Sequence, residues 1–167
     1  MNKLAFVALA TLLCSGGVAF AATQAQQAFM TQAIQGDLAE VQMGKLAQQK
    51  GSTQQTKSFG RMLANDHQAN QQKADQVAKQ IGVTPPTSPS AKQKSDFDRL
   101  SKLSGEAFDR QFAAMMVEGH RKNISEFRRE ARVDSAVGQY AKQTLPTLEK
   151  HLRAAERLEH SSRTTAR

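Results

Sequence analysis

Apolar residues recur at helical spacing along four long segments, and this pattern restricts the possible folds most strongly. Residues three and four positions apart share one face of an α-helix, so each segment predicts an amphipathic helix. The long segments are residues 22–50, 53–81, 106–132 and about 135–160, and a shorter helical segment covers 91–103. The sequence has no alternating strand pattern, and Ala, Gln, Lys and Leu outnumber β-branched residues. The chain is therefore predicted to be all-α.

A proline-rich segment separates the four long helices into two pairs. Three of the four prolines lie in residues 83–90, which should form an extended connection. Two helical hairpins joined by such a crossover predict a four-helix bundle with one short extra helix. We expect one folded domain over residues 22–160 and a flexible tail over 161–167. Pro146 should kink the last helix, and glycines 36, 44 and 60 should allow close helix approach.

The first 21 residues predict a secretory signal peptide. Lys3 precedes an apolar run over residues 4–13, and the small residues Ala19 and Ala21 suit a signal peptidase. The run is too short to span a bilayer stably. Cleavage after Ala21 would also remove Cys14, the only cysteine. We therefore expect an exported, thiol-free protein in the periplasm or associated with the outer membrane.

Three of the four histidines lie one per predicted helix, each toward the apolar side of its helix. Imidazole and carboxylate groups that converge inside a bundle can hold a divalent metal. The candidate metal site consists of Glu40, His67, His120 and His151, with iron, manganese or zinc as the ion. Alternatively, the histidines bind acidic residues on neighbouring helices and fix the packing.

The spacing differs from that of di-iron bundles, in which a glutamate lies three residues before each histidine. Here those positions hold Ala64, Val117 and Leu148, none of which can bind a metal. Glu118 and Glu149 come two residues before a histidine, so they should point outward when the histidine points inward. The sequence therefore disfavours a conventional ferroxidase site.

A basic patch on the predicted helix 106–132 is a candidate anion-binding surface. The chain carries a net charge of +8, which favours an anionic partner. The patch could bind lipopolysaccharide or anionic lipid, whereas export makes nucleic acid a poor partner. A helix face that is simply exposed to solvent is the simpler interpretation. Its residues are Arg121, Lys122, Arg128, Arg129 and Arg132.

The order of several motifs resembles the bacterial exported family known as domain of unknown function 4142. The matching residues are Phe29, Ala33, the Gly36–Val41 and Gly44–Ala47 runs, Phe59 through Asp66-His67, Phe108-Asp109, His120, Leu145-Pro146 and His151-Leu152. The resemblance implies a ferritin-like bundle in the bacterial envelope, and it places Glu40, Asp66, His67, His120 and His151 at positions of the family pattern. It implies no catalytic residue, because no activity is established for the family.

These features lead to three hypotheses for function. The first is an exported, non-catalytic bundle that binds a ligand or protects the envelope under stress. The second is a metal-binding or redox protein that uses the Glu/His site, and the third is a peripheral protein held to anionic lipid by its basic patch. No catalytic residue is predicted, since the chain lacks phosphate-binding glycine loops and hydrolase serine motifs. We expect a monomer or small homo-oligomer.

Overall fold

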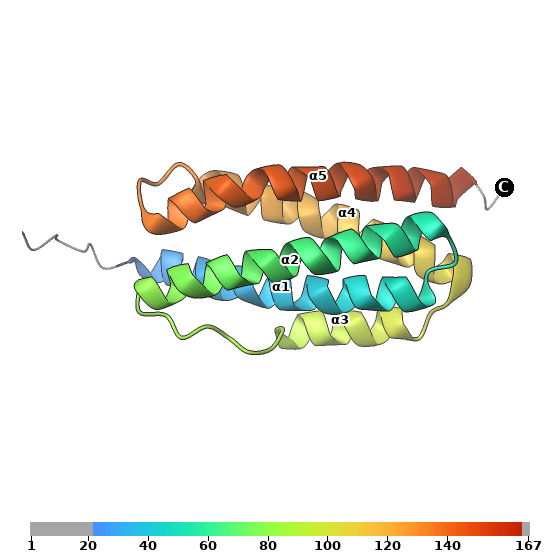
Figure 1. Ribbon diagram of the computed structural model, residues 1–167, viewed down its shortest axis with the longest axis horizontal. Coiled ribbons are helices and arrows are strands. Elements are labelled where there is room, and N and C mark those ends of the chain that lie inside the picture. The colour runs from blue at the N-terminus through green and yellow to red at the C-terminus, as the bar shows by residue number, and fades with distance from the viewer. Residues whose placement is uncertain (1–21, 165–167) are drawn as a thin grey trace, which may run out of the picture.

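A computed structural model describes residues 22–164, and all its regular elements are α-helices. The elements are α1 (Gln24–Lys50), α2 (Gln54–Gln80), α3 (Ala91–Ser101), α4 (Gly105–Glu130) and α5 (Ala136–Thr164). The four long helices lie side by side as a bundle (Figure 1). The predicted all-α bundle with one short extra helix is confirmed. None of the described helices combines the length and apolar character needed to cross a membrane.

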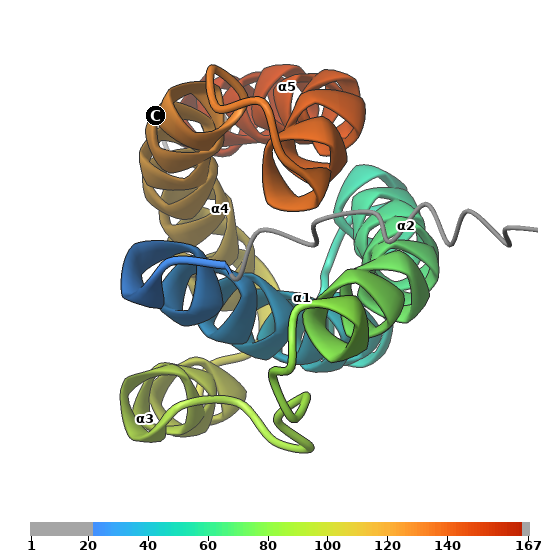
Figure 2. The same cartoon turned by 90° about the vertical axis from the view of Figure 1, so that its left-hand side faces the viewer.

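The long helices form two antiparallel hairpins, α1 with α2 and α4 with α5 (Figure 1). The proline-rich segment and α3 carry the chain back along the bundle, so that α4 starts at the end where α2 starts. Helix α3 packs against α1 and contacts α4, and it lies outside the bundle on the α1 side (Figure 2). The predicted crossover thus consists of the linker together with α3.

Side-chain caps set the starts of the helices. Thr23, Thr53 and Ser90 each accept a hydrogen bond from the backbone amide three residues later, at the starts of α1, α2 and α3. Ser135 Oγ accepts from the Gly138 amide at the start of α5. Gly82 ends α2 with a φ of +76°, a conformation that glycine adopts without strain.

Helix α5 continues to Thr164, so the prediction that it ends at His160 is wrong. Arg163 binds Glu159 one turn back at 2.9 Å, and the Ser161 hydroxyl donates to the Arg157 carbonyl. These local contacts extend the helix through residues that have little apolar surface to bury. The predicted signal peptide and residues 165–167 lie outside the described residues. Pro146 lies inside α5, and its kink stays a prediction.

Helices α1 and α2 approach closely at two glycines. A side chain built at Gly44 would place its Cβ 2.5 Å from the Gly60 carbonyl oxygen, and one built at Gly60 would lie 2.6 Å from the Gly44 carbonyl oxygen. The predicted close approach is confirmed at these positions. It is wrong for Gly36, because a Cβ there would meet nothing within 4 Å.

The bundle core has an apolar cluster toward each end and a polar layer between them. The first cluster includes Met43, Leu46, Phe59, Leu63, Phe108, Phe112, Met116 and Leu158. The second includes Met30, Ile34, Ala74, Ile124, Phe127, Val137, Tyr140 and Leu148. In all four long helices, the residues of the polar layer lie between those of the two clusters; they are Asp37, Glu40, His67, His120 and His151, all buried.

Candidate metal centre

Three of the predicted site residues, His67, His120 and His151, meet in the polar layer as a three-histidine cluster. They come from α2, α4 and α5, and their exposed fractions are 4%, 0% and 0%. Their ring centroids lie 5.1–5.9 Å apart. One nitrogen of each ring lies within 4.8 Å of the other two. These three buried histidines could therefore form a metal site.

The outer nitrogen of each ring donates a hydrogen bond to an oxygen. His67 Nδ1 donates to Asp37 Oδ1 at 2.8 Å, and His120 Nδ1 donates to the Met116 carbonyl at 2.9 Å. His151 Nε2 donates to Asp66 Oδ2 at 2.8 Å. Carboxylate and carbonyl oxygens accept hydrogen bonds, so these contacts favour the tautomer with the proton on the outer nitrogen.

The inner nitrogens of the neutral rings then present lone pairs to one another. His67 Nε2 is buried without a hydrogen-bond partner, and His120 Nε2 lies 3.4 Å from His151 Nδ1. Two lone pairs cannot form a hydrogen bond, so this arrangement needs a cation or an added proton between the rings. A tetrahedral zinc ion bound at 2.0–2.1 Å keeps its nitrogen ligands about 3.4 Å apart. The His120–His151 spacing matches that value, and the third histidine lies within 4.8 Å of both, so these residues could hold a metal ion.

Glu40, the fourth predicted residue, lies beside the cluster. Its Oε1 is 3.9 Å from His120 Nδ1, and its Oε2 is buried without a hydrogen-bond partner. It does not belong to the group of ligand atoms that lie within 4.8 Å of one another. An unpartnered buried carboxylate oxygen is costly, and a nearby cation would offset that cost.

A buried hydrogen-bond network supports His67 at its outer nitrogen, Nδ1. Most of this network was not predicted from the sequence. Asp37, the acceptor of His67, also accepts from Asn70 Nδ2 at 2.8 Å. Asn70 in turn donates to Tyr140 Oη at 2.8 Å and accepts from Thr144 Oγ1 at 3.0 Å. Asn70 lies three positions after His67, a spacing that could have linked the two, whereas no sequence signal indicates Tyr140 or Thr144.

Burial and charge separate the pKa values of the three histidines. Burial lowers the pKa of His120, and burial together with the charge of His67 lowers the pKa of His151 to about 4. Burial also acts to lower the pKa of His67, but the hydrogen bond that His67 donates to Asp37 and the charge of Glu40 outweigh it and raise the value. Burial raises the pKa of Asp37. His120 and His151 are thus neutral at pH 7, the form in which imidazole binds metals.

Asp66 connects the buried cluster to the surface. The carboxylate that accepts from His151 also accepts from Lys150 Nζ at 2.6 Å, and its side chain is 30% exposed. Partial burial acts to raise the pKa of Asp66, but the hydrogen bonds from Lys150 and His151 outweigh it and lower the value. Asp66 therefore remains an anion at neutral pH.

The acids that precede the histidines point outward, as expected. Glu118 is exposed, and Glu149 is half-buried and binds the exposed Arg128 at 2.7 Å. Neither belongs to the group of ligand atoms around the histidines.

Three of the five basic-patch residues are paired with acids. Arg121 binds Glu156 at 2.8 Å, and Arg128 binds Glu149 at 2.7 Å. Lys122 lies 3.9 Å from Glu126. Arg129 and Arg132 are exposed. These pairs reduce the positive charge that the patch offers to an anionic partner.

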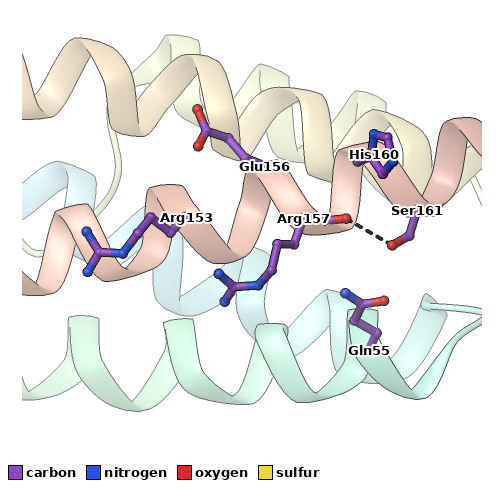
Figure 3. Close-up of a pocket in the computed structure, with 6 residues that line it drawn as sticks. All are labelled: Gln55, Arg153, Glu156, Arg157, His160 and Ser161. Atoms are coloured by element: carbon purple, nitrogen blue, oxygen red, sulfur yellow. Dashed lines mark hydrogen bonds between the residues drawn. The ribbon is translucent and has the colours of Figure 1, made fainter.

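A separate open groove of about 540 Å³ lies between α2 and the end of α5 (Figure 3). Arg153 and Arg157 extend to the same side of α5, toward α2, whereas Glu156 extends away from them. No residue of the three-histidine cluster lines this groove. Its lining residues are Gln55, Arg153, Glu156, Arg157, His160 and Ser161.

Residues 16–158 match the family model described as Domain of unknown function (DUF4142). The chain belongs to this family. The fold is similar to the crystal structure of a DUF305 fragment from Deinococcus radiodurans, with a TM-score of 0.73, 16% identity, and coverage of 84% of this chain and 98% of that chain. At this identity, the likeness supports the fold alone. No curated protein matches the DUF4142 chain.

Proposed function

We propose that this DUF4142 protein binds one divalent transition-metal ion through His67, His120 and His151, with the Glu40 carboxylate beside the cluster to balance charge. The convergence of three inner nitrogens, each opposite a hydrogen-bonded outer nitrogen, carries the proposal. Metal-binding histidines characteristically donate their other N–H to a carboxylate or carbonyl, which fixes the ring and raises its basicity. The outer hydrogen bonds alone suit a packing role, whereas the inner lone pairs that face one another favour a cation between the rings.

The donor set supports a preference among metals. Three imidazoles beside one carboxylate form a nitrogen-rich site, which suits zinc, copper(II) and iron(II) better than magnesium or calcium. Manganese(II) is the weakest binder in the first-row series. We therefore propose that zinc or iron binds more tightly than manganese.

The surroundings favour holding an ion over converting a large substrate. Apolar clusters lie on both sides of the polar layer, and the histidines are almost fully buried. We propose metal holding in the bacterial envelope, the compartment that residues 1–21 predict; protection of the envelope would follow from removal of free ions. Binding to anionic lipid has weaker support, because acids neutralise most of the basic patch.

Metal titration of the untagged mature chain tests the proposal. Metal-free protein should bind one zinc ion per chain by calorimetry and elemental analysis, and His67→Ala or His120→Ala should abolish this binding. His160→Ala is the matched control, because His160 is exposed on α5 and outside the cluster. If wild type binds no stoichiometric metal, or if His160→Ala loses binding equally, the proposed site is wrong.

A further inference from the structure

The three-histidine cluster is closed to solvent along most of the bundle. Apolar clusters fill the core on both sides of it along the bundle axis. Helices α1 and α2 touch at the backbones of Gly44 and Gly60, and α4 and α5 form the second closely packed hairpin. On the α1 side, α3 packs against α1 and contacts α4 (Figure 2). An ion would need another route to the histidines.

The contact between α2 and α5 offers such a route at Asp66. Its side chain is 30% exposed, yet its Oδ2 accepts a hydrogen bond from His151, whose side chain is fully buried. One carboxylate thus touches both solvent and the cluster. Lys150, with a side chain 49% exposed, places its Nζ 2.6 Å from the same oxygen.

We propose that the metal ion reaches the cluster between α2 and α5 by way of Asp66, and that Lys150 controls the rate of its passage. This inference rests on the proposed function. A carboxylate attracts a divalent cation and can bind it transiently before the ion reaches nitrogen ligands. The Lys150 ammonium occupies that carboxylate and repels the cation, so it must move aside first. Exposed ion pairs are weak, and this movement therefore leaves the bundle intact.

Two lysine variants measure this control. Lys150→Gln removes the ammonium from Asp66, and Lys142→Gln makes the same charge change at an exposed position two turns earlier on α5. Stopped-flow absorption would follow cobalt(II) binding to the metal-free mature chain, and competition with a chelator would give its release rate. We expect Lys150→Gln to raise both rates about two- to fivefold, the range typical of losing one exposed ion pair. The dissociation constant should change less than about twofold, because a lower barrier speeds both directions. Lys142→Gln should match wild type.

Asp66→Asn supplies a second measurement at the same place. The variant loses the charge that attracts the ion and the strong acceptor for His151, so cobalt binding should slow and weaken together. Equal rates in Lys150→Gln and Lys142→Gln would overturn the route, as would a changed dissociation constant with an unchanged binding rate. Failure of wild type to bind cobalt stoichiometrically would instead refute the proposed metal site itself.

Discussion

Replacement of Asp37 by Asn should weaken metal binding without weakening the fold. Asp37 holds His67 through a 2.8 Å hydrogen bond, and its charge makes the ring a stronger ligand. Loss of such a partner costs about 10- to 100-fold in metal affinity, equivalent to about 1.4–2.7 kcal/mol. Burial raises the pKa of Asp37, so the buried charge itself opposes folding at neutral pH. Removal of that charge should offset the lost hydrogen bond, leaving metal-free stability within about 1 kcal/mol of wild type.

Asp109→Asn is the matched control, because Asp109 is equally buried but lies outside the cluster. Its carboxylate accepts from the Ser52 amide and hydroxyl at 3.1 and 2.6 Å and from the Thr53 amide at 3.3 Å, at the start of α2. An amide cannot accept all three bonds, so this variant should lose about 1–3 kcal/mol, or roughly 2–12 °C in Tm, and keep its metal affinity. Calorimetric titration and thermal unfolding of both variants measure the two effects. Wild-type metal affinity in Asp37→Asn, or lost metal affinity in Asp109→Asn, would refute the role of Asp37 in supporting the metal site.

Three further predictions concern stability. In the metal-free protein, the pKa of His151 is about 4 in the folded chain and 6.5 in the unfolded chain. As pH falls, the unfolded chain therefore takes up a proton before the folded chain does, and the free energy of unfolding decreases. From about pH 7.5 to 4.5, the free energy of unfolding measured with urea should fall by about 2–3 kcal/mol more in wild type than in His151→Gln. Equal decreases in the two proteins would contradict this. Gly44→Ala should lower the free energy of unfolding by about 1–3 kcal/mol in the same assay, because the new Cβ would lie 2.5 Å from a backbone oxygen. Gly36→Ala should not lower it, because a Cβ there would meet nothing within 4 Å. Zinc at a concentration about 100 times its dissociation constant should raise the free energy of unfolding of wild type by about 2.7 kcal/mol. A thermal melt should show this stabilisation in wild type and none in His67→Ala.

Much of the fold could be predicted because it depends on local signals. Helical periodicity and caps such as Ser135 act within a few residues, so the sequence indicates where most helices begin and end. The end of α5 depends instead on weak one-turn contacts such as Arg163 with Glu159, which periodicity does not reveal. Gly36 and Gly44 look alike in sequence, and only helix packing distinguishes them.

The candidate site could be predicted only in its residue types. One histidine per helix on an apolar face indicates that the rings converge, but the nitrogen that points inward depends on acceptors from other helices. Asp37 fixes His67, and Asp66 fixes His151, through contacts that require the register between helices. The pairing of Arg121 and Arg128 with glutamates of α5 depends on that register in the same way.

The most direct test is the metal content of the untagged mature chain after equilibration with a slight excess of zinc and removal of unbound metal. We predict about one zinc ion per chain in wild type and in His160→Ala, and none in His67→Ala or His120→Ala. Wild type without bound metal would refute the proposed metal site and leave the three histidines as packing residues of the bundle.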